Sequence, residues 1–283
     1  MIRLVASDVD GTIIGENNQI TSENLKAIHD MTESHIDFTI CTGKPYCMVK
    51  NFCKDLQATY GIFGNGNQII DLKTGKEIFR KTLLQEDMNT CISLAKKENL
   101  HIHLYTENEV ITSELRYMDL RNFILKDSLF HSDLKFKIVT DIQEYIHQNQ
   151  PTVFKLIISS PSSLSNLQEE LGKKMNLTIY RINKSHEYKD KIINKEYEYL
   201  DITPNKTNKS EALEILSQYL KLSSSEVMAI GDNLNDIEMI QNSGIGVAVA
   251  NAYDAVKQVA NYTTTHSVDD SGFAEAVYKY ISF

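Results

Sequence analysis

Residues 2–12 read IRLVASDVDGT, and this stretch decides how the chain folds. The apolar run from Ile2 to Ser7 is typical of a short buried strand. Asp8 and Asp10 follow it two positions apart, so both carboxylates leave the strand on the same side. Two unpaired carboxylates in such a place repel each other, and a bound cation would remove the repulsion. The stretch therefore predicts a strand that ends at a cation site, although an ordinary Asp-Gly turn is the simpler alternative.

Three further segments resemble buried strands, and each also ends in polar residues. They are Phe38–Cys41 before Thr42-Gly43-Lys44, Tyr60–Phe63 before Asn65-Gly66-Asn67, and Val227–Ile230 before Gly231-Asp232 and Asn235-Asp236. Helical patterns lie between the strands, as expected for a parallel sheet with helices on both faces. Ligands of such sheets bind beyond the carboxyl ends of the strands, so we expect the four clusters to meet in one site.

The pattern changes in the middle of the chain. Helical segments such as Gln85–Glu98 and Leu115–Leu125 alternate there with strand-like segments such as Val153–Ser159, and the strands lack polar clusters at their ends. We therefore predict an α/β protein with a doubly wound, mainly parallel Rossmann-like core sheet that is interrupted by an α+β domain. The predicted boundaries are residues 1–83 and 204–283 for the core and residues 84–203 for the inserted domain.

Carboxylates at a strand end suit phosphoryl transfer. Asp8 is the candidate nucleophile because it comes first off the strand, where an attacking oxygen can be held in line with phosphorus. A carboxylate that attacks phosphorus forms an acyl phosphate and so divides one difficult step into two. Asp10 would protonate the leaving alcohol and later deprotonate the attacking water. Asp232 would complete a magnesium site, since Mg²⁺ prefers oxygen ligands and takes few carboxylates.

Further polar residues at the strand ends are candidates for binding phosphate. Thr42 offers a hydroxyl group, and Gly43 lets the backbone approach an anion closely, although a capped turn explains both equally well. Asn235 offers its side-chain amide. Asp236 stands at a predicted helix start, where it would orient metal-bound water or a lysine, with helix capping as its alternative.

Lys209 breaks a local rule. It precedes a helix that is predicted to begin near Glu211, and a cation there opposes the helix dipole at a cost of about 0.3–1 kcal/mol. Broken local rules tend to mark functional sites, so Lys209 is the candidate for holding the phosphate and stabilising Asp8 as an anion. Lys206 is its rival, and a solvated surface lysine is the alternative for either residue.

Two histidines in the inserted domain are a weaker signal. His101 and His103 lie two positions apart on a predicted strand, so they share one face of it. Most such histidines are structural, and a contact to substrate is the alternative.

The composition disfavours several functional classes. The chain has 283 residues and a net charge of -9, which opposes binding to nucleic acid or an anionic membrane. Its apolar runs are shorter than the roughly 20 residues of a membrane-spanning helix, and carboxylates come too early for a signal peptide. The four cysteines lack metal-binding spacing, which indicates free thiols in a reducing cytosol. We expect a cytoplasmic protein that is a monomer or a weak homo-oligomer.

The four motifs together resemble the haloacid dehalogenase superfamily, and within it the Cof-type branch of sugar and metabolite phosphatases. They are Asp8-Val9-Asp10-Gly11-Thr12, Thr42-Gly43, Lys209, and Gly231-Asp232-Asn233-Leu234-Asn235-Asp236. Residues 246–252 and 271–274 also look like the C-terminal segments of that branch. The inserted domain falls between the second and third motifs, where the branch carries its cap domain, so the resemblance covers the whole chain.

The resemblance implies a Mg²⁺-dependent phosphatase that acts on a small phosphorylated metabolite, such as a sugar phosphate, through an aspartyl-phosphate on Asp8. It implies that Asp8 is also a metal ligand, that Asp10 is the acid and base and binds the metal through its backbone carbonyl, and that Asp232 is the third protein ligand. The residues that would contact phosphate are Thr42, Gly43, Lys209 and Asn235.

Two positions depart from the branch's pattern. Lys44 stands where the branch often has Arg, and Asn67 stands where Ala is common after Asn-Gly. Both lie near the expected mouth of the site, so they bear on substrate preference rather than on the chemistry. The inserted cap domain is expected to select the substrate.

Two other functions fit the same scaffold. A phosphosugar mutase would return the phosphate to a sugar instead of releasing it. A binding or regulatory module would keep the fold without turnover, and the intact pair Asp8 and Asp10 disfavours this reading.

Overall fold

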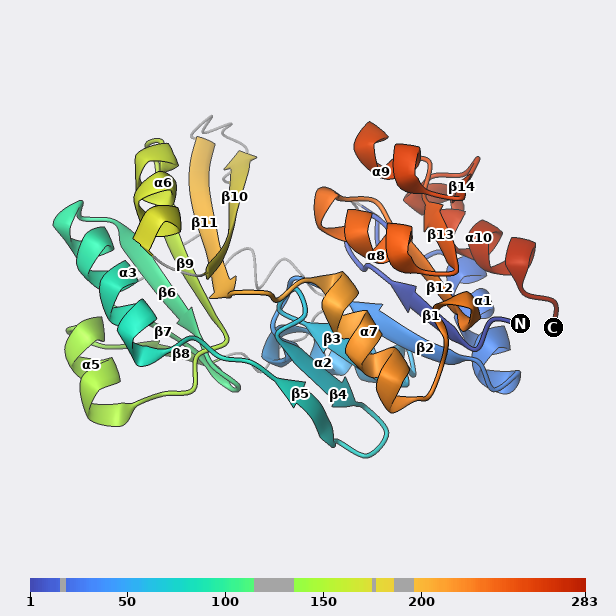
Figure 1. Ribbon diagram of the computed structural model, residues 1–283, viewed down its shortest axis with the longest axis horizontal. Coiled ribbons are helices and arrows are strands. Elements are labelled where there is room, and N and C mark those ends of the chain that lie inside the picture. Colours follow the sequence, from blue (N-terminus) through green and yellow to red (C-terminus); the bar gives the residue numbers. More distant parts are fainter. Residues whose placement is uncertain (16–18, 115–134, 175–176, 186–195) are drawn as a thin grey trace. The chain divides into compact units, whose positions relative to one another are not determined.

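The computed structural model describes residues 1–15, 19–114, 135–174, 177–185 and 196–283 (Figure 1). The chain divides into two compact units, which we call the core unit and the inserted unit. The core unit joins Met1–Arg80 to Asn208–Phe283, and the inserted unit is Lys81–Thr207. The sequence pattern places the insertion at residues 84–203.

The core unit is built on an eight-stranded sheet with the strand order β14-β13-β12-β1-β2-β3-β4-β5. Its strands are β1 (Leu4–Ser7), β2 (Asp37–Cys41), β3 (Tyr60–Phe63), β4 (Gln68–Asp71), β5 (Glu77–Arg80), β12 (Val227–Gly231), β13 (Ile245–Ala248) and β14 (Tyr262–Thr263). Neighbouring strands from β14 to β3 run parallel, whereas β4 and β5 are antiparallel additions. Leu4 of the central strand β1 lies opposite Asp37 and Val227, so β1 is flanked by β2 and β12. The mainly parallel α/β sheet expected from the sequence is confirmed.

Six helices of the described core unit cover this sheet. They are α1 (Ser22–Glu33), α2 (Tyr46–Asp55), α7 (Lys209–Tyr219), α8 (Ile237–Asn242), α9 (Asp254–Val259) and α10 (Gly272–Tyr280). In Figure 1, α7 and α8 lie in front of the strands and α2 lies behind them, so both faces of the sheet are covered. Thr21 caps α1 by accepting the N–H of Asn24, and Asn208 caps α7 by accepting the N–H of Glu211. These caps satisfy N–H groups that a helix start otherwise leaves without a partner.

The inserted unit has its own six-stranded sheet, in the order β10-β11-β9-β6-β7-β8. Its strands are β6 (His101–Tyr105), β7 (Glu109–Thr112), β8 (Lys135–Ile138), β9 (Lys155–Ser160), β10 (Leu177–Ser185) and β11 (Glu196–Pro204). Its described helices are α3 (Gln85–Lys97), α5 (Ile142–Asn149) and α6 (Ser165–Lys174). All strand pairs except β7 with β8 are antiparallel, so the unit has the α+β character expected from the sequence. The helix expected at Leu115–Leu125 lies outside the described residues.

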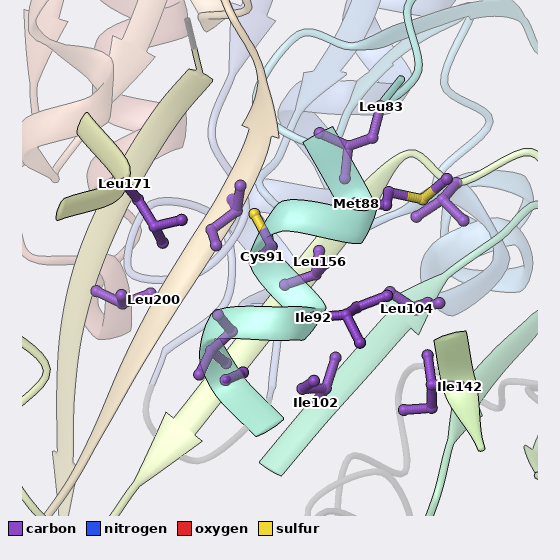
Figure 2. Packing of buried hydrophobic residues seen from close by; sticks show 14 of the residues in the cluster. Leu83, Met88, Cys91, Ile92, Ile102, Leu104, Ile142, Leu156, Leu171 and Leu200 are labelled. Atoms are coloured by element: carbon purple, nitrogen blue, oxygen red, sulfur yellow. The ribbon is translucent and has the colours of Figure 1, made fainter. Parts of the chain in front are cut away.

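One face of the inserted sheet and its helices form a separate apolar core. Figure 2 shows Ile92 of α3 beside Ile102 and Leu104 of β6, with Leu156 of β9 close by. Ile102 and Leu104 alternate with residues of the opposite face, because successive side chains of a strand point to opposite sides. The inserted unit therefore buries its own apolar residues without needing the core of the other unit.

The described chain also bears on two expectations from composition. The four cysteines are free thiols, as expected from their spacing. Of the helices in the described ranges, none combines the length and the apolar character required to cross a bilayer.

Replacing Ile92 with Ala should lower the free energy of unfolding of the inserted unit by about 2–5 kcal/mol, because the deletion leaves a cavity in a packed core. Ile92 is completely buried, whereas Ile138 of the same unit is 59% exposed. The matched Ile138→Ala variant should cost less than about 1 kcal/mol. Urea unfolding followed by circular dichroism measures both values, and equal losses would contradict the described packing.

Candidate active site

The carboxyl ends of three adjacent strands bring the predicted residues together. Asp8 follows β1, Thr42 follows β2, and Asp232 follows β12. The N–H of Asp8 donates to the carbonyl of Ile230 over 3.0 Å, which extends the ladder between β1 and β12 to the site. Parallel strands end at the same edge of a sheet, so residues more than 200 positions apart meet there.

A buried lysine connects two of the acids. Lys209 Nζ lies 2.5 Å from Asp8 Oδ1 and 2.6 Å from Asp236 Oδ1, and the Lys209 residue is 1% exposed. Burial lowers the pKa of Lys209, but the carboxylates of Asp236 and Asp8 outweigh it and raise that pKa above its ordinary value. Lys209 therefore stays charged. Its rival Lys206 is exposed.

The helix start explains why Lys209 can occupy this place. The helix begins at Lys209, two residues before the start expected from the sequence, because Asn208 supplies the cap. A lysine in the first turn opposes the helix dipole. The two carboxylates on its ammonium group offset that cost.

Asp236 orients its neighbours. Its Oδ1 accepts from Lys209, and its Oδ2 accepts the backbone N–H groups of Asp232 and Asn233 over 3.1 and 3.0 Å. It also closes a capping box with Asn233 around the short 3₁₀ helix η3 (Leu234–Asp236). The Asp236 side chain therefore both caps η3 and orients Lys209, two roles that the sequence had suggested as alternatives.

The acids of the site carry more negative charge than the protein compensates. Carboxylate oxygens of Asp8, Asp232 and Asp236 all lie within 4.8 Å of one another. Burial raises the pKa of Asp8 well above its usual range, Lys209 opposes this, and the neighbouring acids add to it. Burial and the Asp236 carboxylate raise the pKa of Asp232 to about 6. Hard oxygen donors held together against their repulsion fit a divalent cation such as Mg²⁺.

A glycine shapes the first loop. Gly11 has a φ of +86°, and a Cβ atom added to it would lie 2.4 Å from Oδ2 of Asp232. Any side chain would therefore displace a carboxylate of the site. The other oxygen of Asp232 accepts the hydroxyl of Thr12 over 3.0 Å, and the carbonyl of Gly11 accepts the amide of Asn251 over 2.7 Å.

Two of the predicted phosphate contacts, Thr42 and Gly43, lie in the loop after β2, whereas Asn235 belongs to η3. Thr42 is buried, and its hydroxyl accepts the N–H of Lys44 over 3.1 Å. Asn235 donates its amide to Oδ1 of Asn65 over 3.0 Å. The N–H of Asn65 in turn donates to the carbonyl of Thr42, and a Cβ atom on Gly43 would lie 2.9 Å from Oδ1 of Asn65. Asn65 thus joins two loops, a role that its strand-end position hinted at and that sequence reasoning did not assign.

Asp10 has a partner that the sequence did not reveal. The ammonium group of Lys44 pairs with both carboxylate oxygens of Asp10. The Lys44 side chain is 15% exposed and that of Asp10 is 54% exposed. The pair joins the loop after β1 to the loop after β2.

His101 and His103 belong to the inserted unit and lie apart from these acids in the chain. Their ring centroids are 4.3 Å apart. The Nε2 atom of His101 lies 2.7 Å from the carbonyl of Glu114, while both ring nitrogens of His103 are buried without a hydrogen-bond partner in the described structure. Burial and, to a smaller extent, nearby His101 lower the pKa of His103 to about 3. His103 is therefore a neutral side chain at pH 7.

His103 should make the protein sensitive to acid. An unfolded histidine has a pKa of about 6.5, so the unfolded chain binds a proton that the folded protein excludes from about pH 6.5 down to about pH 3. Stability from this group is full above that window and falls as the pH drops through it, by about 2 kcal/mol between pH 7 and pH 5.

Urea unfolding at the two pH values tests this prediction. His103→Leu should lose less stability on acidification than the wild type, because the variant has no proton to take up in the unfolded state. His147→Leu, which alters an exposed histidine of the same unit, should keep the wild-type difference. An unchanged difference in His103→Leu would contradict the burial of a neutral imidazole.

A family model described as haloacid dehalogenase-like hydrolase matches residues 5–277, which is nearly the whole chain. The chain belongs to this family. The match confirms the resemblance carried by the motifs, and with it the expectation of a hydrolytic enzyme of the haloacid dehalogenase type.

Two curated relatives and one solved structure match this chain over most of their own lengths. The chain is 28% identical over 277 residues to the 5-amino-6-(5-phospho-D-ribitylamino)uracil phosphatase YcsE of Bacillus subtilis, covering 98% of this chain and 94% of that protein. It is 27% identical over 259 residues to the HMP-PP phosphatase of Yersinia pseudotuberculosis, covering 91% and 87%. A solved haloacid dehalogenase-like hydrolase from Bacteroides thetaiotaomicron matches with a TM-score of 0.83 over 99% of this chain and 100% of that chain, at 23% identity. This structural likeness confirms the fold.

Proposed function

We propose that the protein is a Mg²⁺-dependent phosphatase that hydrolyses a small phosphorylated metabolite, such as a sugar phosphate, through an aspartyl-phosphate on Asp8. The observation that carries the proposal is the buried contact of Lys209 with Asp8 and Asp236. This contact holds the Asp8 carboxylate in a fixed position, beside other acids whose oxygens suit a divalent cation. The relatives named as phosphatases of small phosphorylated compounds support the same reaction class.

Asp8 acts as the nucleophile. One of its carboxylate oxygens attacks phosphorus, and the bond between phosphorus and the leaving oxygen breaks. The ammonium group of Lys209 favours the ionised carboxylate, which opposes the effect of burial. The buried ion pair also fixes the direction of the carboxylate, which lowers the entropic cost of reaching the reactive geometry.

Asp10 moves the protons. It donates a proton to the leaving oxygen as the first bond breaks, and it then takes a proton from the water that attacks the aspartyl-phosphate. The second step releases inorganic phosphate and regenerates Asp8. Acid–base assistance of this kind contributes about 10²–10⁴-fold to a rate.

The phosphoryl group would be held by the loop that follows β2 and by residues near it. Thr42 offers its hydroxyl, Gly43 its backbone N–H, and Asn235 its amide once the amide leaves Asn65. Lys209 supplies positive charge. Donors in fixed positions stabilise the charge that develops on the phosphoryl oxygens.

The residues that would hold Mg²⁺ are the Asp8 and Asp232 carboxylates and the backbone carbonyl of Asp10. When bound, the ion neutralises phosphoryl charge and offsets the repulsion among the acids. Asp236 remains occupied by Lys209 and two backbone N–H groups, which suits an orienting role.

We also propose that the inserted unit is the cap that selects the substrate and excludes water during transfer. Its separate apolar core supports this role, because a unit that folds on its own interactions can move as a body. The net charge of -9 supports a small-molecule substrate rather than a nucleic acid. A cytoplasmic location and a monomer or weak homo-oligomer complete the proposal.

Asp8→Asn should abolish hydrolysis of p-nitrophenyl phosphate while the fold is retained, because an amide is a far weaker nucleophile than a carboxylate. Phosphate release measures the activity, and circular dichroism checks the fold. Asp30→Asn, which changes a surface acid of the same unit, should keep wild-type turnover. Near-normal turnover by the Asp8 variant would overturn the assigned nucleophile.

Removal of divalent cations with a chelator should abolish the same activity, and added Mg²⁺ should restore it. Asp232→Asn should require at least about tenfold more Mg²⁺ for half-maximal activity, because it removes one charged ligand. Glu238→Gln, at an exposed acid nearby, should show the wild-type requirement. Undiminished turnover in chelator would remove the metal from the proposal.

A further inference from the structure

Lys209 balances only part of the negative charge of the site. Four aspartates meet two lysines among the described residues of the site, so the side chains in their fully ionised forms carry two negative charges in excess. A divalent cation brings this balance to zero. A phosphate monoester also carries up to two negative charges, so its binding is favoured by a cation that can turn toward it.

Lys209 cannot supply that movement. Its side chain is completely buried, and its ammonium group is held by Asp8 and Asp236 at 2.5 and 2.6 Å. Turning away would leave two buried carboxylates without their cation, which is strongly unfavourable. Lys209 is therefore a fixed charge.

Lys44 is less deeply buried than Lys209, and its carboxylate partner in the site is exposed rather than buried. It directly follows Thr42 and Gly43, the residues proposed to hold phosphate. Its site partner Asp10 has a carboxylate that is 54% exposed, so water can solvate this acid when the lysine leaves it. An ion pair with one solvated partner contributes little to stability and is easily exchanged.

The backbone of Lys44 is anchored, while its ammonium group pairs with the exposed carboxylate of Asp10. Its N–H donates to the hydroxyl of Thr42, and its carbonyl accepts the N–H of Gly64 over 3.0 Å. The side chain is 15% exposed. A short movement of the flexible stem can therefore redirect the charge without moving the loop.

We infer that Lys44 is a phosphate-binding residue that exchanges Asp10 for an oxygen of the substrate's phosphoryl group. This inference rests on the proposed function. In the free protein the lysine neutralises Asp10, and in the complex it pairs with the phosphoryl group and leaves the Asp10 carboxyl free to face the leaving oxygen. Asp10 and phosphate thus compete for one cation.

Equilibrium binding of inorganic phosphate in the presence of Mg²⁺ tests the exchange without requiring turnover. Lys44→Met should raise the dissociation constant for phosphate by about tenfold or more, because a charge-assisted hydrogen bond is lost. Lys44→Arg should restore most of the affinity, since it keeps the charge. Lys26→Met, which removes a lysine from the surface pair with Asp30, should bind phosphate like the wild type.

Competition between Asp10 and phosphate for Lys44 predicts that the effect of an Asp10 substitution on phosphate affinity depends on whether Lys44 is present. A purely structural ion pair would not produce this dependence. Asp10→Asn removes the carboxylate that competes with phosphate for Lys44 and should tighten phosphate binding. The same substitution made in the Lys44→Met background should tighten it much less, and calorimetric titration of all four proteins measures the difference.

Three outcomes would overturn the inference. They are wild-type phosphate affinity in Lys44→Met, an equal effect of Asp10→Asn with and without Lys44, and a wild-type protein that binds no phosphate. Failure of the proposed function would look different, since a wild type that binds phosphate but hydrolyses no phosphomonoester would refute the phosphatase assignment alone.

Discussion

The ammonium group of Lys209, buried between Asp8 and Asp236, is the interaction on which the rest of the site depends. Each member comes from a different part of the core unit: the end of β1, the start of α7 and the turn after β12. Loss of one partner from a buried ion pair costs about 3–5 kcal/mol, because the remaining charge is left without compensation. The three elements are therefore held in one register by charge as well as by the sheet.

The same interaction explains the electrostatics around it. Burial and the neighbouring acids outweigh the effect of Lys209, so Asp8 and Asp232 retain pKa values above their ordinary range. A site with this surplus of negative charge suits a divalent cation, which in turn favours the binding of an anionic phosphoryl group. Gly11 adds a steric condition, because a Cβ atom there would meet the Asp232 carboxylate.

The inserted unit has its own sheet, and the two faces of that sheet differ in character. Its apolar face packs on helices such as α3, and this core includes Ile92 and Leu156. The other face carries His103, whose ring nitrogens are buried without partners in the described structure. Such groups lower stability, so a protein keeps them at a cost of about 1–3 kcal/mol each. Natural sequences tend to break local rules of this kind where function requires it.

The sequence by itself determined the parallel core sheet, the presence of an inserted α+β segment and the family. It could do so because apolar periodicity and strand-end polar motifs are local signals that do not depend on distant partners. It missed the antiparallel strands β4 and β5, because each has only two apolar residues between polar ones, which is too weak a pattern to separate a strand from a loop.

Only the tertiary structure decided which charged groups meet. The sequence left Lys206 and Lys209 as rivals, and burial beside Asp8 separated them. It gave no sign that Lys44 pairs with Asp10 or that Asn235 binds Asn65. Such pairs join loops that are 34 and 170 positions apart in the chain. The physical reason is that an ion pair or amide hydrogen bond depends on distance in space, which the folded sheet fixes and local sequence does not encode.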